Sequence, residues 1–260
     1  MMKKLQTIYE THFNQYLMFQ TIDLEYYFKK VKKIELNIDS FTFYNAVSAM
    51  SSSKIEGEQM DIDSYLKYKT TKTKYVESLV QKPNDLYKAY EFAQKNNLTK
   101  NKLLKAHKII SKHLLHTTFR GKVRDSDMII KDGKTGKIVY EACLKDNVEA
   151  EFDAFFTEVK LLLKKELTLQ EIFFFASLIH LQFVKIHPFD DGNGRVGRLL
   201  EKWFLASKLG QNAWFIQSEL NYWTNREDFY RNLNKVGFFY DKLNFENSIN
   251  FLIMLPKALK

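Results

Sequence analysis

Residues 187–198 read His-Pro-Phe-Asp-Asp-Gly-Asn-Gly-Arg-Val-Gly-Arg and contain three of the nine glycines of this 260-residue chain. An apolar stretch from about 167 to 186 precedes this segment, and residues 196–209 follow it with the spacing of a helix. We therefore expect a tight loop between two helices, because glycines allow the backbone to turn. Backbone N–H groups exposed in such a loop, next to the positive end of a helix dipole, form a site suited to phosphates.

Two cations and two carboxylates accompany this loop. Arg195 and Arg198 are three residues apart, so both guanidinium groups project from one face of the second helix. Two fixed cations beside an anion site suit a di- or triphosphate better than a single carboxylate. A carboxylate in a phosphate site repels its ligand unless a cation lies between them, so Asp191 implies Mg²⁺ held also by phosphate oxygens. Asp190 could serve equally by its chemistry.

Histidines are the next candidates for chemistry. His187 stands at the C-terminal end of the first helix, where an imidazole can take a proton near neutral pH, and we expect it to be catalytic. His180 lies further back inside the same helix and is expected to be a hydrogen-bonded core residue. Because no HExxH pattern and no cysteine pair occurs, His107, His113 and His116 are expected to be surface or capping residues rather than zinc ligands.

The composition favours a helical protein. Hydrophobic residues make up 45% of the chain and charged residues 27%, as in ordinary folded domains, which excludes wholesale disorder. Nine glycines and three prolines leave few positions that break a helix. The one β signal is a pair of apolar segments, 128–131 and 137–140, around a turn rich in Gly and Asp. The expected fold class is all-α with one small β-hairpin.

Several boundaries along the chain can be predicted. Residues 1–33 have the pattern of two amphipathic helices rich in aromatic side chains. A third helix is expected to begin at a cap, Asp39 or Ser40, and to run to Glu56, with Gly57 as the left-handed residue that ends it. Further boundaries are expected at these positions: 67–74 as the weakest-packed connection, Pro83-Asn84 as the start of a helix, Thr99 as the cap of a helix reaching Leu115, and 146 as the point from which helices continue almost to Pro256.

Charge, cysteine content and hydropathy bear on the compartment and the partners. Lys and Arg number 40 and Asp and Glu 31, which gives a net charge of +9. Nucleic-acid binding would explain this excess, but lysine-rich solvated helix faces explain it better. The single cysteine, Cys143, cannot form an internal disulfide, which favours a reducing compartment. Polar residues interrupt the most apolar stretch, 172–186, and no signal-peptide pattern begins the chain, so we expect a cytoplasmic protein without a membrane span.

The segment 187–198 resembles, residue for residue, the motif His-Pro-Phe-x-(Asp/Glu)-Gly-Asn-Gly-Arg-x-x-Arg of the Fic (Fido) family of protein adenylyltransferases. The resemblance implies that His187 is the base that deprotonates a hydroxyl of a target protein. It also implies ATP as the co-substrate and Asp191 as the ligand of Mg²⁺. The residues implied to hold the phosphates are Gly192, Asn193 and Gly194 for the α- and β-phosphates and Arg195 and Arg198 for the β- and γ-phosphates, with Phe189 packed inward as the anchor of the loop.

A second match lies far upstream, at residues 51–57. Ser52, Glu56 and Gly57 occupy the fixed places of a pattern similar to the family's inhibitory motif, (Ser/Thr)-x-x-x-Glu-(Gly/Asn). Glu56 falls in the last turn of the expected helix, where the helix dipole disfavours an anion, so we expect a compensating cation from elsewhere. The resemblance implies that Arg198 is this cation and that the chain belongs to the subgroup with an N-terminal inhibitory helix, here about 40–57. Ser52 stands one turn before Glu56 and could hydrogen-bond in the same site.

The expected hairpin resembles the family's flap, which holds the target segment by strand addition beside the active site. The family often closes the first strand with Gly where this chain has Lys131. The residues that match this region are Arg124, Met128, Ile129, Ile130 and Lys131.

A further segment is similar to the region that lines the family's adenine pocket. Phe229 and Tyr230 stand where a Tyr-Tyr pair is common, and Gly237 stands where Asn is frequent. The resemblance spans about 39–236. It implies an N-terminal helical subdomain over 1–95 that carries the inhibitory helix, a Fic catalytic core over 96–245 and a C-terminal helix over 246–260.

The function implied by the resemblance is transfer of AMP from Mg·ATP to a Ser, Thr or Tyr hydroxyl of a target protein, with autoinhibition by Glu56. The alternatives within the fold are transfer of another nucleotide or of a phosphate group, and removal of AMP. An alternative from another class is a basic DNA-binding regulator, which rests on the +9 charge alone. Self-modification and a homo-oligomer stay open, whereas nucleic acid and a membrane are not expected partners.

Overall fold

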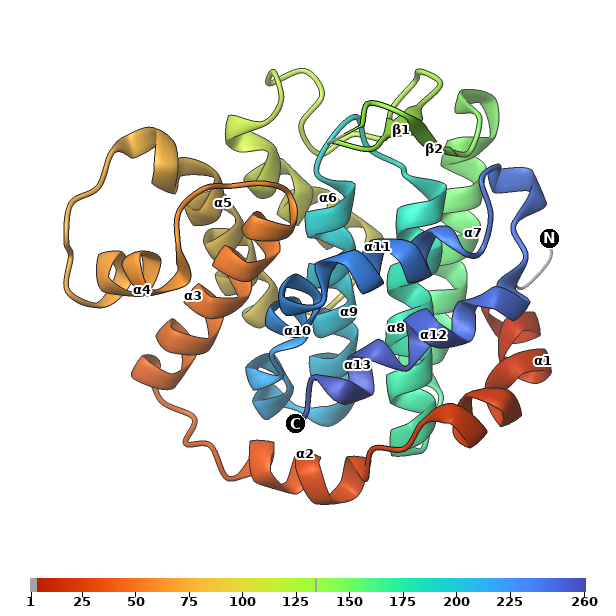
Figure 1. Ribbon diagram of the computed structural model, residues 1–260, viewed down its shortest axis with the longest axis horizontal. Helices are drawn as coiled ribbons and strands as arrows, with labels where there is room; N and C mark the ends of the chain where they lie inside the picture. The colour runs from red at the N-terminus through yellow and green to blue at the C-terminus, as the bar shows by residue number, and fades with distance from the viewer. Residues whose placement is uncertain (1–3, 134) are drawn as a thin grey trace.

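Two antiparallel central helices, α8 and α9, form the axis of the fold, and the other helices surround them, as the ribbon of the computed structural model shows (Figure 1). The structure describes residues 4–133 and 135–260. It is all-α with one β-hairpin, as the sequence predicts. The elements are α1 (Lys4–Phe19), α2 (Leu24–Lys32), α3 (Ile38–Ile55), α4 (Ile62–Thr70), α5 (Glu77–Gln94), α6 (Lys100–Ile110), β1 (Ile129–Lys131), β2 (Ile138–Glu141), α7 (Lys145–Lys164), α8 (Leu169–Ile186), α9 (Asn193–Leu209), α10 (Ser218–Thr224), α11 (Arg226–Asn234), α12 (Ile249–Leu252) and α13 (Met254–Lys257).

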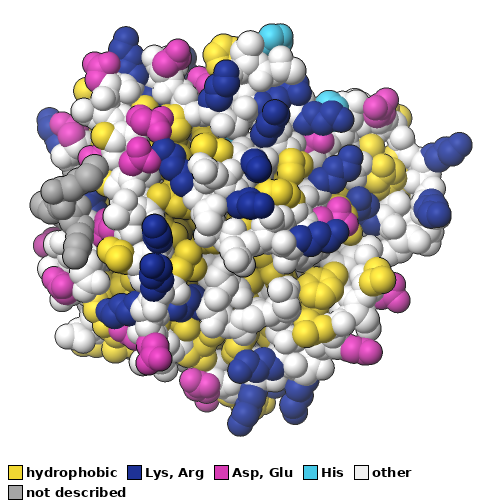
Figure 2. Space-filling view, turned by 180° about the vertical axis from the view of Figure 1, so that it is seen from behind, with side chains coloured by type: hydrophobic (Ala, Val, Ile, Leu, Met, Phe, Trp, Pro, Cys, Tyr) yellow, Lys and Arg dark blue, Asp and Glu magenta, His cyan; other side chains and the backbone are white. Residues whose placement is uncertain are grey.

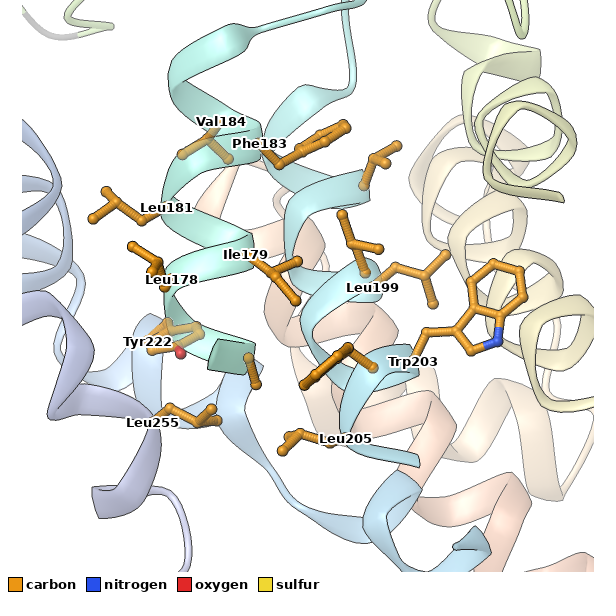
Figure 3. Packing of buried hydrophobic residues seen from close by; sticks show 14 of the residues in the cluster. Leu178, Ile179, Leu181, Phe183, Val184, Leu199, Trp203, Leu205, Tyr222 and Leu255 are labelled. Atoms are coloured by element: carbon orange, nitrogen blue, oxygen red, sulfur yellow. The ribbon is translucent and has the colours of Figure 1, made fainter. Parts of the chain in front are cut away.

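Helix α8 is buried on nearly all sides. It begins with a capping box, in which the Thr168 hydroxyl accepts from the Glu171 amide and the Glu171 carboxylate accepts from the Thr168 amide. Figure 3 shows Ile179 directed at α9 and Leu181 directed at the opposite side. By length and composition α8 could cross a membrane, but 83% of it is buried inside the protein, as the central helix of a folded core is.

Glycine 197 brings α9 close to α8. A Cβ at this position would lie 2.7 Å from Val184 Cγ1 and 2.9 Å from His180 Cδ2, distances that real Cβ atoms do not show. The two helices that flank the loop 187–192 are therefore fixed at a spacing that only glycine allows. Both ends of the loop are therefore held by this helix pair.

The third helix carries an unusual run of buried polar residues. It starts one residue after Asn37, whose side chain accepts a hydrogen bond from the Ser40 amide, so the cap is Asn37 and the predictions of Asp39 or Ser40 are wrong by two or three residues. The helix ends at Ile55, and Gly57 has φ +95°, the left-handed conformation expected of it. Its buried polar side chains are Asn45, Ser48, Ser51, Ser52 and Ser53.

Two of the predicted boundaries in the first half of the chain are wrong. Residues 67–70 belong to α4, which Asp61 caps, so the predicted connection shrinks to the segment between α4 and α5. Pro83 lies inside α5, which already begins at Glu77. A proline there costs one helical hydrogen bond, but burial of Val80 and Leu86 on the same helix offsets this loss.

The later boundaries agree more closely with the sequence. Thr99 caps α6 as predicted, although the helix ends at Ile110 and a 3₁₀ turn, Ser111–His113, continues it. The segment 246–260, expected to be one helix, contains α12 and α13 with a break at Ile253. One continuous hydrophobic core joins α1, α3 and α5 to α8, α9 and these last helices.

The hairpin lies at one end of the α8–α9 pair (Figure 1). Strands β1 and β2 are antiparallel, with Ile129 opposite Glu141 and Ile130 opposite Tyr140. The other edge of β2 is bonded at the Glu141 amide, which donates to the Phe238 carbonyl at 2.8 Å. In the described part of the chain, β2 is the partner of β1 in the sheet, so the outer edge of β1 has no strand beside it.

Charge is unevenly distributed on the face of the molecule seen in Figure 2. Lys and Arg side chains prevail in the upper right part of this view, with few Asp and Glu side chains among them, whereas acidic side chains are more frequent towards the left edge.

Substitution of Gly197 tests the close contact of α8 and α9. We expect Gly197→Ala to lower the free energy of unfolding by about 1–3 kcal/mol, because the added methyl group overpacks the interface with Val184. Urea unfolding followed by circular dichroism measures the change. Gly133→Ala is the matched control, since a Cβ at Gly133 meets nothing within 4 Å. Equal stability of the two variants would show that the helices can separate at no cost.

Candidate active site

The loop after α8 begins with a strained residue. His187 caps the helix with φ +55° and ψ +59°, a left-handed conformation that costs free energy for a residue with a side chain. Arg124 holds this turn: its Nε donates to the His187 carbonyl at 2.8 Å, and its amide donates to the Pro188 carbonyl at 2.9 Å. Its Nη1 and Nη2 donate to the carbonyls of Ser126 and Cys143. Arg124, expected in the flap, therefore also positions His187.

Phe189 anchors the loop in the core, as expected. Its ring is buried and stacks on His107 with a centroid distance of 3.7 Å. The side chain of Asn193 spans the loop, since its Oδ1 accepts from the Phe189 amide at 3.0 Å and its Nδ2 donates to the Phe189 carbonyl at 2.7 Å. The Asn193 side chain thus holds the loop together, and the group it leaves for a ligand is its backbone N–H.

His107 is a site residue that the sequence did not reveal. The prediction of a surface or capping role is wrong for it, because it is fully buried beneath the loop. Its Nδ1 accepts from the Gly121 amide at 3.0 Å, so the proton is on Nε2, which donates to the Asp191 carbonyl at 3.1 Å. The other two histidines differ: His113 pairs with Asp85 at 2.6 Å, and His116 is exposed.

The imidazole of His187 is set up to act as a base. Its Nδ1 lies 3.1 Å from the Val184 carbonyl, and because a carbonyl only accepts, Nδ1 carries the proton and Nε2 is bare. Burial, together with the charges of Arg124 and Lys185, lowers the pKa of His187 to about 4, even though the hydrogen bond to Val184 and the Glu56 carboxylate act in the opposite direction. The ring is therefore neutral at neutral pH. By contrast, His180 binds Glu201 in the core, as expected.

The first turn of α9 presents free backbone donors. No side chain caps this helix among the described residues, and Gly192 stands before it with φ +84°. The N–H groups of Asn193, Gly194 and Arg195 are therefore available to an anion at the positive end of the helix. A Cβ on Gly194 would lie 2.4 Å from Glu56 Oε1, so glycine at this position allows a carboxylate or a phosphate to approach the backbone.

Arg198 is bound by the C-terminal end of α3. Its Nη2 lies 2.6 Å from Glu56 Oε1, and its Nε donates to the Ser52 hydroxyl at 2.8 Å. The Ser52 carbonyl accepts a further bond from Nη2 at 3.2 Å. Burial alone would raise the pKa of the Glu56 carboxyl, but the charges of Arg198 and Arg195 hold it below its ordinary value. The expected pairing of Glu56 and Arg198, and the expected bond to Ser52, are both present.

A second carboxylate, which the sequence did not reveal, holds the other arginine. Glu58 Oε1 lies 3.1 Å from Arg195 Nη2 and 3.0 Å from Lys82 Nζ. Arg195 is buried, and its Nε has no hydrogen-bond partner within the described part of the chain. Arg195 and Arg198, both on α9, are thus each paired with a carboxylate. These carboxylates, Glu58 and Glu56, stand two residues apart in the segment that follows α3.

Asp191 has an unused carboxylate oxygen. The residue is exposed, and its Oδ1 accepts from the neighbouring Gly192 amide at 2.6 Å. No group of three or more His, Cys, Asp or Glu side chains comes together in residues 4–133 and 135–260, so no all-protein metal cage exists there. A single free carboxylate beside a phosphate site nevertheless fits Mg²⁺, which keeps waters and phosphate oxygens as its other ligands. Asp190 is half-buried, and burial raises its pKa.

The His187 side chain, the Glu56–Arg198 pair and the start of α9 lie around a cavity of about 730 Å³. The hairpin, the C-terminal ends of α3 and α8, the start of α9 and helix α11 line it. Helix α11 contributes Phe229, which is buried against His180, and Tyr230, whose hydroxyl donates to the Ile55 carbonyl at 3.2 Å. Of the predicted site residues, those in the lining are Glu56, Gly57, Ile130, Lys131, His187, Gly194, Arg198, Phe229 and Tyr230, whereas Ser52, Met128, Ile129, Asp191, Gly192, Asn193 and Arg195 stand behind or beside it.

The support that His107 gives the loop can be tested through pH. Burial lowers the pKa of His107 to about 4 from an ordinary 6.5, so the unfolded chain binds more protons between these values and stability falls as the pH drops. We expect His107→Gln to lose about 2 kcal/mol less stability than the parent chain between pH 7 and pH 5. Urea unfolding at the two pH values measures this. The same loss in both chains would mean that His107 is not held neutral.

Comparison with known proteins identifies a matching family model and similar solved structures. Residues 97–205 match the model of the Fic/DOC family. No curated protein matches the sequence. Among solved structures, a Fic family protein from Desulfovibrio desulfuricans G20 superimposes with a TM-score of 0.71 at 18% identity, covering 100% of this chain and 72% of that one.

Two further solved structures have a similar fold. A Fic domain containing signaling protein from Bacteroides thetaiotaomicron VPI-5482 gives a TM-score of 0.67 at 16% identity, with 98% and 92% of the two chains covered. Fic-1 from C. elegans gives 0.66 at 14% identity, with 98% and 71% covered. The matched stretch 97–205 contains α6, the hairpin, α8, the loop 187–192 and most of α9. Residues 97–205 therefore form a Fic/DOC family domain, built around the loop that follows α8.

Proposed function

We propose that this protein transfers AMP from ATP to a Ser, Thr or Tyr hydroxyl of a target protein. Fic family proteins are typically transferases. The observation that carries the proposal is the neutral His187, protonated on Nδ1, which lines the same cavity as Arg198 and Gly194 at the start of α9. A base, an anion site and a second cation, Arg195, stand beside one another, as transfer of a nucleotide to a hydroxyl requires.

The reaction follows from these groups. His187 Nε2 takes the proton of the target hydroxyl, whose oxygen forms a bond to the α-phosphorus of ATP. The bond from the α-phosphorus to the bridging oxygen breaks, and pyrophosphate leaves with the electron pair. The N–H groups at the start of α9, together with Arg195 and Arg198, stabilise the negative charge that develops on the pyrophosphate. Phe229 and Tyr230 supply an aromatic wall for the adenine base.

The proposed reaction uses Mg²⁺, for which Asp191 is the proposed protein ligand. Asp191 would hold the ion with its free carboxylate oxygen, and Mg²⁺ would neutralise charge on the phosphates. Asp190 is the less suitable ligand because it is half-buried, whereas Asp191 is exposed.

The hairpin is the proposed docking place of the target. The outer edge of β1, from Met128 to Lys131, has no strand beside it in the described residues, so an extended segment can pair with it. Ile130 and Lys131 line the same cavity as His187, so a segment paired with β1 would lie near this histidine. We further propose that a second copy of this chain can serve as the target, through self-modification.

The structure represents an inhibited arrangement under this proposal. Glu56 occupies the side of Arg198 that a γ-phosphate would need, and Glu58 does the same at Arg195. ATP bound beside these carboxylates would have a misplaced α-phosphate, and a shift of about 1 Å can lower the rate roughly a hundredfold. The chain would thus belong to the subgroup inhibited by an N-terminal helix.

Labelled nucleotides test the reaction directly. The Glu56→Gly chain, incubated with Mg²⁺ and ATP labelled at the α-phosphate, should transfer the label to protein with a mass increase of one AMP, whereas His187→Ala in the same background should transfer none yet still bind ATP. Parallel incubations with ATP labelled at the γ-phosphate and with other nucleoside triphosphates distinguish the alternatives within the fold. Transfer of the γ-label, or transfer that survives His187→Ala, would contradict the proposal. Asp191→Ala should lose activity and Mg²⁺-dependent affinity together, and Asp190→Ala should lose less.

Inhibition by the two carboxylates gives a graded expectation. Glu56→Gly should raise AMP transfer by a factor on the order of ten to a hundred, because it frees Arg198 for the phosphate. Glu58→Gln should raise it severalfold, since Arg195 then loses its partner. Initial rates at matched ATP measure both.

Two controls accompany these variants. Glu56→Gln separates the loss of charge from the extra flexibility of glycine, and Glu77→Gln removes a carboxylate from the exposed start of α5. Parent-like rates in Glu56→Gly and Glu58→Gln alike would show that neither carboxylate inhibits.

A further inference from the structure

Lys185 is a buried cation at the cavity without an anionic partner. It stands in the last turn of α8, is 2% exposed and lines the cavity two residues before His187. Its Nζ lies 3.9 Å from the centre of the Tyr140 ring of β2. Within the part of the chain that the structure describes, no carboxylate pairs with it and no acceptor takes a hydrogen bond from it.

The other buried Lys and Arg side chains within residues 4–133 and 135–260 have hydrogen-bond acceptors. Lys202 binds Glu219 and Ser48, and Arg198 binds Glu56 and Ser52. Arg124 donates to backbone carbonyls. Burial without a carboxylate lowers the pKa of Lys185 to about 8, so most of the ammonium is still charged at neutral pH. The Tyr140 ring offsets part of the cost of burying this charge, and an anion from a ligand would offset more.

The surroundings of Lys185 indicate which ligand brings the anion. The proposed donors for the phosphates are the first turn of α9, Arg195 and Arg198. Lys185 instead lies against the hairpin, because its Nζ sits on Tyr140 and its carbonyl accepts from the Tyr140 hydroxyl at 2.6 Å. Tyr140 pairs with Ile130 of β1, whose outer edge is the proposed docking edge. The free cation therefore stands on the target side of the cavity.

We propose that Lys185 is a specificity residue, which selects target segments with an Asp or Glu on the same face as the modified hydroxyl. In an extended segment, side chains of one face recur every second residue, so the acid stands an even number of positions from the hydroxyl. The carboxylate would form a charge-assisted hydrogen bond with the Lys185 ammonium inside the cavity. This inference rests on the proposed transfer to a protein hydroxyl.

The test uses the full chain with Glu56→Gly, so that transfer is fast enough to measure. The probes are synthetic peptides with one Ser, Thr or Tyr and with Asp, Asn or Lys two positions before or after it. The measured quantities are kcat/KM for each peptide and the KM for ATP. Lys185→Met, Lys185→Arg and Lys185→Glu are compared, with Lys164→Met, an exposed lysine of α7, as the control for a change in net charge.

Peptides with Asp at one of the two positions should be labelled about tenfold better than those with Asn, and Lys185→Met should abolish this preference without a change in the KM for ATP. Lys185→Arg should retain the preference, and Lys185→Glu should reverse it towards Lys. A merely structural role cannot reverse a preference. If Lys185→Glu fails to fold, Lys185→Met still decides the matter.

Two results would overturn the inference while the proposed function stands. One is labelling that is equal for Asp, Asn and Lys peptides. The other is a loss in Lys185→Met that is the same for all peptides and comes with a raised KM for ATP, which would assign the lysine to the nucleotide. Absence of labelling on any peptide and on protein would instead overturn the proposed function, and this inference with it.

Discussion

The guanidinium of Arg198 is the group on which the proposed inhibited arrangement depends. Buried on α9, it requires partners, and α3 supplies them with Ser52 and Glu56. One turn further along, Lys202 of α9 donates to Ser48 of α3 in the same way. The two helices are therefore joined by a row of polar contacts rather than by an apolar seam. This row fixes the end of α3 at the mouth of the cavity, where Glu56 meets Gly194.

These contacts limit how the inhibition could be relieved. The bonds from Lys202 to Ser48 and from Arg198 to Ser52 do not involve the carboxylate, so they can persist when a phosphate replaces Glu56. The helix then needs no displacement as a whole. Under the proposed function, a change in the side chain of Glu56 and in the turn at Gly57, which is already left-handed, would be enough to exchange the carboxylate for a phosphate at Arg198. The proposed activation is thus a local event in a rigid frame.

Some features of the fold and of the site could be predicted because they depend on short local segments of the sequence. The loop 187–198, the hairpin and the Thr99 cap follow from residues close together in the chain. The parts that it missed depend on distant partners. The role of His107 depends on its stacking with Phe189, and the role of Glu58 depends on its ion pair with Arg195. Neither contact can be recognised from the local sequence. Ser48 of α3 also escapes a pattern that assigns polar residues to the surface, because its partner, Lys202, lies on α9, 154 residues later.

The distribution of charge in the cavity then separates its two ends. At the α9 end, the cation Arg198 is already compensated by a carboxylate of the same chain, so a ligand must displace that carboxylate to bind. At the hairpin end, the cation Lys185 has a tyrosine ring as its neighbour and no anion among the described residues. A nucleotide therefore competes with an internal group, whereas an acidic target segment would meet an open site. Under the proposals made above, binding of ATP requires displacement of Glu56 from Arg198, whereas binding of an acidic target segment at Lys185 displaces no carboxylate. The availability of Arg198 would then determine the rate of transfer, and Lys185 would determine which target is selected.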